Sequence, residues 1–215
     1  MRGKVERENF YLLNDGTPFS IPSEYWSNLM KRDVNELSRL TLFDIFSSNG
    51  LVFHFLHKKI KIDIKKRELE IFNKKSWEKS SDPLLELIVL LYLNNATFFY
   101  PIGKDIASVS QLSEAHFFKG YHKLKTDPLI KQFENDIEGF KKSAKCLDGQ
   151  SVNFADAAYR FLPFPKVPLY YLFWKGDKEF APNITVLFEK SIKKVLPASW
   201  IWGLVNLVSS ELKFN

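Results

Sequence analysis

Residues 157–174 read Ala-Ala-Tyr-Arg-Phe-Leu-Pro-Phe-Pro-Lys-Val-Pro-Leu-Tyr-Tyr-Leu-Phe-Trp, and this stretch decides the fold of the C-terminal half. Two apolar runs of strand length, Ala157–Leu162 and Val167–Trp174, flank a stiff turn that contains two prolines. The second run is apolar at odd and even positions alike, which is typical of a strand covered on both faces. We therefore predict that it lies inside a sheet. The Gly176-Asp177 turn and a further strand, Ile184–Phe188, follow it.

A second sheet is predicted in the N-terminal half, where apolar and polar residues alternate. After a strand over Leu51–Leu56, the segments Lys59–Ile64 and Glu68–Phe72 both show a period of two. If Lys65-Lys66 forms a two-residue loop, apolar residues face apolar residues and opposite charges face each other. The pairs expected in this register are Ile60 with Ile71, Ile62 with Leu69, and Lys61 with Glu70.

The same region carries most of the positive charge of the chain. Lys and Arg number 31 against 25 Asp and Glu, which gives a formal net charge of +6. Residues 57–79 hold nine of these basic residues and four of the acidic ones, so the rest of the chain is almost neutral. The alternation places these charges on the solvent face of a hairpin, where they keep the edge of a sheet soluble.

Helix starts are marked by capping residues. Asp82-Pro83 opens the helix Leu84–Leu93, which is apolar nearly all round, as expected of a helix in the centre of a core. Other helices are expected from Ser23, from Asp33 with Glu36 as a capping box, from Asp127-Pro128 to Leu147 with Gly149 as the stop, and from Pro197 to Leu212. Ile106–Leu112 is expected as a strand, and His116–His122 as a short helix or loop.

Together these elements predict an α+β protein with mostly antiparallel sheets, a central apolar helix and a C-terminal helix. No linker, internal repeat or low-complexity segment interrupts the chain. We therefore expect residues 1–215 to form a single compact domain, with residues 1–80 and 81–215 as possible subdomains.

Composition excludes several classes of protein. Aromatic residues make up 15% of the 215 residues, with 20 Phe, 8 Tyr and 5 Trp, so the chain is not of the disordered kind. The lone Cys146 excludes an intramolecular disulfide and any zinc or iron–sulfur site built from several cysteines. It fits a reducing cytoplasm. We expect no signal peptide, because residues 1–8 contain no apolar core. We expect no membrane span, because no apolar run approaches ~20 residues.

Familiar catalytic and nucleotide-binding motifs are absent from the sequence. It contains no Gly-x-Gly-x-x-Gly, no phosphate-binding Gly-Lys-Ser/Thr loop, no Gly-x-Ser-x-Gly and no His-Glu-x-x-His. The histidines are His54, His57, His116 and His122. Their spacings favour no metal site, since His54 and His57 face opposite sides of a strand.

The densest group of functional side chains lies between Asp156 and Pro182. Arg160 falls in an apolar strand, on the face of Ala158 and Leu162, where a guanidinium needs a partner. Two interpretations are open: an ion pair with Asp156, Asp177 or Glu179, or a clamp for a carboxylate or phosphate. Asp177 and Glu179 likewise have two interpretations: an acid/base pair or cation site, or a β-turn aspartate with a solvated neighbour.

The high aromatic content of the chain also has two explanations. Core filling accounts for most of it, but the polar ends of Tyr and Trp need a partner or the edge of a cleft. Such a cleft would suit a flat or ring-shaped ligand. The candidate ligand-binding residues are Tyr100, Arg160, Tyr171, Trp174, Asp177 and Glu179.

A resemblance is carried by the run from Asp156 to Pro168 and by residues 172–182, Val186–Phe188 and Leu196-Pro197. The order of these segments resembles an uncharacterised family, carried as a domain of unknown function, of proteins of about this length from anaerobic bacteria and archaea. The helix after Asp82 and the Asp127-Pro128 region fit as well, so the resemblance covers most of the chain.

The resemblance implies no established activity. Some relatives are associated with corrinoid and one-carbon metabolism, and some carry an added iron–sulfur segment with four cysteines. The present chain departs from the latter because it has only Cys146.

The leading hypothesis is a cytoplasmic, non-catalytic binding or accessory protein for a planar or corrinoid-type cofactor, or for the partner protein that carries it. One alternative is a small-molecule enzyme that uses Asp177 or Glu179 with Arg160 as an anion clamp. Another is a weak nucleic-acid binder that uses the basic hairpin of residues 58–79. That hairpin has interleaved acids and only Phe72 and Trp77 as stacking residues, so nucleic acid is not the favoured partner. No membrane partner is expected, because no apolar run is long enough to cross a bilayer.

Overall fold

The structure, a computed structural model, describes residues 21–96, 105–190 and 192–214. The described residues form two antiparallel sheets of five strands each together with helices, which confirms the α+β prediction. The chain divides into two compact units, residues 1–99 and 100–215, and each contains one of the sheets. The organisation of residues 1–215 as a single domain stays a prediction.

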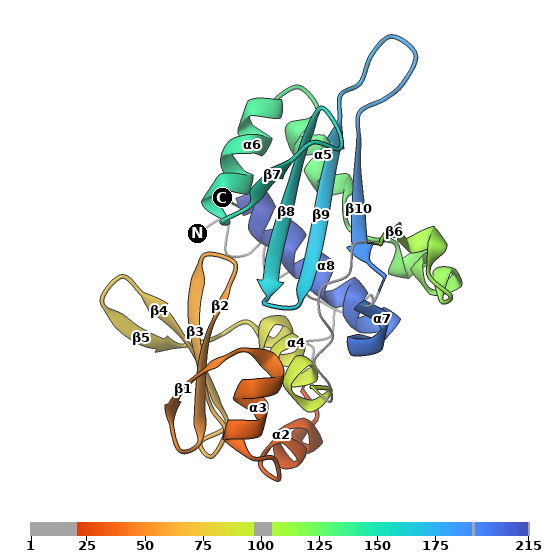
Figure 1. Cartoon of the computed structure of the whole chain (residues 1–215). Coiled ribbons are helices and arrows are strands. Elements are labelled where there is room, and N and C mark those ends of the chain that lie inside the picture. The colour runs from red at the N-terminus through yellow and green to blue at the C-terminus, as the bar shows by residue number, and fades with distance from the viewer. Residues whose placement is uncertain (1–20, 97–104, 191, 215) are drawn as a thin grey trace. The chain divides into compact units, whose positions relative to one another are not determined.

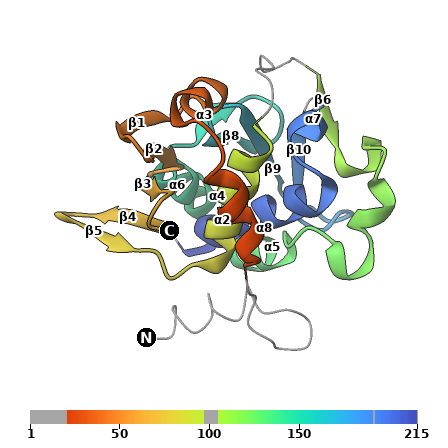
Figure 2. The ribbon, with the colours of Figure 1, turned by 90° about the horizontal axis from the view of Figure 1, so that it is seen from below.

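The sheet of the N-terminal unit is a meander, in which each strand pairs with the next one along the chain (Figure 1). Its strands are β1 (Asp44–Ser47), β2 (Gly50–Phe55), β3 (Lys58–Asp63), β4 (Glu68–Asn73) and β5 (Ser76–Lys79). The predicted register of β3 against β4 is confirmed, with Ile60 opposite Ile71 and Lys61 opposite Glu70. The β4–β5 ribbon projects beyond the other strands of its sheet (Figure 2).

The core of this unit joins the sheet to the apolar helix α4 (Pro83–Asn94), whose residues from Ile88 to Leu93 are all buried. The ring of Tyr92 on α4 lies 5.5 Å from the ring of Phe43, which in turn stacks on Phe53 of β2 at 4.0 Å. The predicted central position of this helix is therefore confirmed for its own unit.

Capping explains where the helices of the N-terminal unit begin. The Asp82 carboxylate accepts hydrogen bonds from the N–H groups of Leu84 and Leu85, as predicted. Asp33 accepts from the N–H of Glu36 at the start of α3 (Val34–Thr41). The prediction of Ser23 as a cap is wrong. Helix α2 (Ser23–Leu29) includes that residue, and its N-cap position is occupied by Pro22 without a side-chain bond.

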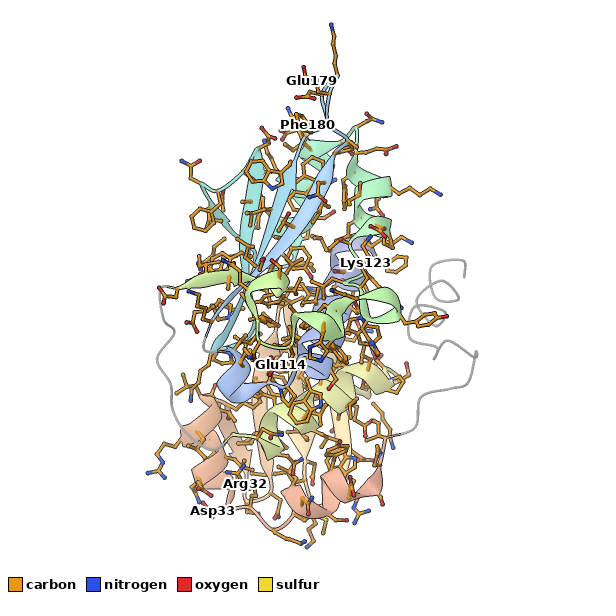
Figure 3. All side chains as sticks on the ribbon, turned by 90° about the vertical axis from the view of Figure 1, so that its right-hand side faces the viewer. Arg32, Asp33, Glu114, Lys123, Glu179 and Phe180 are labelled. Atoms are coloured by element: carbon orange, nitrogen blue, oxygen red, sulfur yellow. The ribbon has the colours of Figure 1, made fainter. Side chains whose placement is uncertain are left out.

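Arg32, which follows α2, closes the opposite end of α4. Its guanidinium donates to the carbonyl oxygens of Leu93 at 2.9 Å, Asn94 at 3.3 Å and Ala96 at 2.7 Å. The last carbonyls of a helix have no partner within the helix and carry the negative end of its dipole. One cation therefore satisfies the end of α4 and ties it to the α2–α3 junction, where Figure 3 labels Arg32 and Asp33.

The sheet of the C-terminal unit has the order β6-β10-β9-β8-β7. Its strands are β6 (Ile106–Ser108), β7 (Gln150–Val152), β8 (Ala157–Phe164), β9 (Val167–Trp174) and β10 (Asn183–Glu189). The predicted internal position of β9 is confirmed, because it pairs with β8 on one side and with β10 on the other. The predicted strand Ile106–Leu112 is too long: it ends at Ser108 and continues as a 3-10 turn, η1 (Val109–Gln111).

Three helices lie along one face of this sheet (Figure 1): α5 (Asp127–Phe133), α6 (Ile137–Cys146) and α8 (Ala198–Phe214). The hydroxyl of Tyr171 on β9 reaches Ser209 of α8 at 2.9 Å. The ring of Phe140 on α6 lies 5.3 Å from that of Phe173 on β9. Because Tyr171 and Phe173 are two residues apart, they share this face, and Tyr170, Leu172 and Trp174 lie on the other one.

The expected single helical region from Asp127 to Leu147 is wrong. It is two helices: α5 ends at Phe133, and Asp136 caps α6 by accepting from the N–H of Gly139 at 2.8 Å. The stop is confirmed: Asp148 takes a positive φ of 59°, and the N–H of Gly149 donates back to Ala144. The region around His116–His122 forms the short 3-10 turns η2 (Ala115–Phe118) and η3 (Gly120–His122).

Helix α8 begins just after Pro197, as predicted, and follows the short α7 (Ile192–Val195). Residues 97–104, which include the candidate Tyr100, lie outside the described residues. Among the residues that are described, no helix combines the length and the apolar character needed to cross a bilayer.

Candidate functional site

The candidate site is the face of the C-terminal sheet opposite α8, which we call the Tyr170 face. Cross-strand pairing places Gln150 of β7, Arg160 of β8, Tyr170 of β9 and Leu187 of β10 in one row across it. The next row holds Val152, Ala158, Leu172 and Thr185. The sequence prediction that Arg160 shares a face with Ala158 is therefore confirmed, and this face collects one cation among aromatic and aliphatic groups.

Arg160 is half-buried, and within the described residues its guanidinium donates to Gln150 Oε1 at 2.6 Å. Of its expected partners, Asp156 instead accepts a hydrogen bond from the N–H of Lys175 at 2.8 Å. The residue beside the guanidinium is thus a neutral amide. A guanidinium has five N–H donors, so the bond to Gln150 uses one of them.

An aromatic surface adjoins Arg160. The ring of Phe154, in the connection between β7 and β8, lies 5.9 Å from the ring of Tyr170 and is tilted by 48°. Ala158, Tyr170 and Leu172 form a buried apolar cluster against which Val152 and Ala155 pack. Phe154 itself is 45% exposed. The Tyr170 face therefore presents an accessible ring directly above a buried one.

Trp174 lies at one end of the Tyr170 face and is 43% exposed. It is four residues beyond Tyr170 on the same strand, which corresponds to roughly 13 Å at the usual rise of a β-strand. Trp174 and Arg160 thus share a face, but Arg160 lies near the middle of it and Trp174 at its end.

Tyr171 is a candidate of another kind, because it lies on the α8 face and is fully buried. Its hydroxyl makes hydrogen bonds with the carbonyl of Val205 and with Ser209 Oγ, at 3.0 and 2.9 Å. Burial raises the pKa of Tyr171 above its ordinary range. These contacts give Tyr171 a role in joining β9 to α8, away from Arg160.

Asp177 and Glu179 belong to the loop between β9 and β10, which extends past the end of the sheet in Figure 1. Asp177 Oδ1 accepts from the N–H groups of Glu179 at 2.8 Å and Phe180 at 2.7 Å. Its N–H in turn donates to the carbonyl of Phe180. These backbone hydrogen bonds lower the pKa of the Asp177 carboxyl group. The Asp177 carboxylate therefore stabilises a β-turn, which is the second of the two interpretations of Asp177 and Glu179. With its lowered pKa it is a weak base.

The tip of this hairpin also displays an aromatic side chain. Phe180 is 69% exposed, and Figure 3 labels it on this loop, with Glu179 further out. Of the six candidates, the structure brings Arg160 and Trp174 to one face. Tyr171 lies on the other face, Asp177 and Glu179 lie on the loop, and Tyr100 is outside the described residues.

Sequence reasoning missed Gln150, Phe154 and the importance of Tyr170. Gln150 lies on a three-residue strand without an apolar pattern, so only the pairing of β7 with β8 places it beside Arg160. Tyr170 had a usable signal, because a period of two groups it with Leu172 and Trp174 and separates it from Tyr171.

Metal-binding groups are sparse in the part of the chain that the structure describes. No cluster of three or more His, Cys, Asp and Glu side chains suited to a metal ion occurs there. Cys146, at the end of α6, is exposed.

Comparison with known families identifies the chain. The model of the family described as Domain of unknown function (DUF3786) matches residues 33–211. The chain belongs to this family. The DUF3786 match begins at Asp33, the cap of α3, and ends within α8, so it spans both compact units. The predicted resemblance to an uncharacterised family, carried as a domain of unknown function, is thereby confirmed. No curated protein and no solved structure matches the chain.

Proposed function

We propose that this DUF3786 protein is a non-catalytic binding protein whose Tyr170 face holds a planar or ring-shaped ligand with an acidic group. A corrinoid-type cofactor, free or carried by a partner protein, is the first candidate. The observation that carries the proposal is the row in which Arg160 stands between Gln150 and Tyr170. A cytoplasmic location, expected from the lone Cys146, is part of the same proposal.

The chemistry of this row suits a ring that carries a carboxylate or phosphate. Phe154, which is exposed and packs against the buried Tyr170, supplies a flat apolar surface on which a ring packs in offset or tilted geometry. Arg160 beside them supplies a planar cation able to bind an anionic group with two parallel hydrogen bonds. Its described partner, Gln150, is uncharged, so an incoming anion does not have to displace a carboxylate.

The arrangement of the acids supports a binding role over a catalytic one. An enzyme of the alternative kind needs Asp177 or Glu179 within hydrogen-bond reach of a substrate held by Arg160. Asp177 instead accepts the N–H groups of its own turn, and its pKa is lowered. Arg160 lies in the middle of β8, and its partner Tyr170 is four residues before Trp174, the last residue of β9 ahead of the loop.

A titration tests the proposal. The purified protein is mixed with a cobalamin and, separately, with a haem, and absorbance and melting temperature are followed. Binding shifts the absorbance bands and raises the melting temperature, because a ligand that binds only the folded state stabilises it. No band shift and no rise in melting temperature with either compound would sink the proposal.

Matched variants locate the binding surface. Arg160→Gln is expected to weaken binding roughly tenfold, the loss of one charge-assisted contact, and Phe154→Ala to weaken it as well. Phe180→Ala removes an exposed ring of the same type from the hairpin tip and is expected to leave affinity unchanged. Equal affinity in all three variants would place the ligand elsewhere and contradict the assignment to the Tyr170 face.

A further inference from the structure

The N-terminal sheet has a solvent face on which aromatic rings surround a lysine, and we call it the Lys61 face. Ile60 and Ile62 are buried on the other side, so Lys61 lies on the outer face of β3. Its Nζ is 4.7 Å from the ring centroid of Trp77 on β5 and 5.8 Å from that of Phe46 on β1. The Lys61 face thus gathers rings from both edge strands of the sheet.

Two of the rings on this face are open to solvent. Phe46 is 43% exposed and Phe72 is 41% exposed. Phe72 pairs with Trp77 across β4 and β5, and their rings lie 5.3 Å apart. Large apolar side chains gathered on the surface of a soluble unit mark a contact surface.

Three acids of this sheet are neutralised by its own lysines, while Asp44 of β1 and Glu78 of β5 make no ion pair within the described residues. Glu70 pairs with Lys61 at 2.9 Å, Glu68 with Lys79 at 3.5 Å, and Asp63 with Lys66 at 4.0 Å. Other cations of the same sheet make no ion pair within the described residues: Lys59, Lys65, Arg67, Lys74 and Lys75. The sheet therefore carries an excess of positive charge that its own acids do not balance.

These cations flank the rings. Lys65 and Arg67 belong to the turn between β3 and β4, at one end of the Lys61 face. Lys74 and Lys75 form the turn between β4 and β5, at the other end. Lys59 stands beside Phe72, since Ile60 pairs with Ile71 in the adjacent position.

We propose that the Lys61 face binds single-stranded nucleic acid. Unpaired bases stack on exposed aromatic side chains whatever their sequence, while lysine and arginine attract the phosphates. A row of rings bordered by cations at both ends offers both interactions at once. In a duplex the base faces are already stacked, so these rings favour a single strand.

The sequence alone argues against this function because it shows only Phe72 and Trp77 as stacking residues. The structure adds Phe46, which comes from the unpredicted strand β1 and reaches Lys61 from the other side. The Lys61 face belongs to the N-terminal unit and the Tyr170 face to the C-terminal unit, so each proposal can fail without the other.

Fluorescence anisotropy of labelled oligonucleotides tests the proposal on the full chain. The probes are a single-stranded oligothymidine, an oligouridine, and a duplex of the same length. At low salt we expect both single strands to bind and the duplex to bind at least about tenfold more weakly. The affinity should fall steeply as salt is added, because phosphate contacts release counterions.

Paired variants separate stacking from charge. Phe72→Ala and Phe46→Ala are each expected to weaken single-strand binding about tenfold, while Phe180→Ala, an exposed ring in the other unit, leaves it unchanged. Lys59→Gln should weaken binding more than Lys178→Gln, which removes an equal charge from the β9–β10 loop. Circular dichroism of each variant confirms that it is folded.

Two results would overturn the proposal. The first is no anisotropy change with either single strand at low salt. The second is binding that responds to the lysine substitutions but not to loss of the rings, with heparin or a polyglutamate peptide competing as well as the oligonucleotide. That second result would show a general polyanion surface without base stacking.

Discussion

The hydroxyl of Tyr171 lies 2.9 Å from Ser209 Oγ and 3.0 Å from the carbonyl oxygen of Val205, which joins the central strand of the C-terminal sheet to helix α8. Both partners are buried among apolar groups, where a polar atom without a partner is costly. This contact leads to a stability prediction.

Tyr171→Phe is expected to lower the free energy of unfolding by about 1 to 2 kcal/mol, because it removes two hydrogen bonds from a buried site. Urea unfolding followed by circular dichroism measures the change. Tyr170→Phe is the control. The Tyr170 hydroxyl makes no hydrogen bond within the described residues, so its loss should leave the midpoint nearly unchanged. Equal effects of the two substitutions would contradict the prediction.

Arg32→Ala is expected to destabilise the end of α4 by about 2 kcal/mol, because three carbonyl oxygens lose a charged donor. Native-state hydrogen exchange of the amides in the last turn of α4 reports the change locally. Arg39→Ala removes an exposed arginine from α3 and should leave those amides as protected as before.

Asp82→Ala is expected to cost about 1 kcal/mol, since the N–H groups of Leu84 and Leu85 lose their acceptor at the start of α4. Asp82→Ser keeps an acceptor and should retain most of the stability. Chemical unfolding of the two variants compares them. If the serine variant is as unstable as the alanine variant, capping is not the cause.

The Asp177 turn is expected to loosen in acid. Hydrogen bonds from the Glu179 and Phe180 amides lower the pKa of the carboxyl group from its ordinary value of 3.8. The charged form is therefore favoured by the folded turn. Its stabilising effect is present above pH 3.8 and is lost as the pH falls through the lowered pKa. Amide chemical shifts of Glu179 and Phe180 should titrate with a midpoint below 3.8, and a midpoint above that value would contradict the prediction.

The sequence was sufficient to predict elements whose patterning is strong and local. Alternating Ile60 and Ile62 set the register of the β3–β4 hairpin, and Asp82-Pro83 set the start of α4. Strand β1 carries no such pattern, since its Ile45 and Phe46 are both exposed around a bulge. Strand β5 has Trp77 as its single large apolar residue, so it also lacks a period.

The candidate site was only partly predictable for a related reason. The position of Arg160 on the face of Ala158 followed from alternation, and it is confirmed. The hydrogen-bond partner of Arg160 could not be predicted in this way. We expected a nearby acidic residue, because opposite charges attract. The neutral Gln150 becomes its neighbour through pairing between β7 and β8. Contacts that depend on which strands are neighbours leave no local signal in the sequence.

The order of strands in the two sheets has a consequence for the folding of the chain. In the N-terminal meander each strand pairs with the next one along the chain, so the loops are short and the entropic cost of closing them is small. Strand β6, in contrast, pairs with β10, whose residues are about eighty positions further along the chain. During synthesis the strands of the first sheet can pair as soon as each hairpin has been made. Strand β6 can pair with β10 only after the chain has been synthesised as far as Glu189. Pulse-labelling hydrogen exchange during refolding should therefore protect β2 and β3 before β6. Simultaneous protection of these strands would show that the two units fold as one cooperative body.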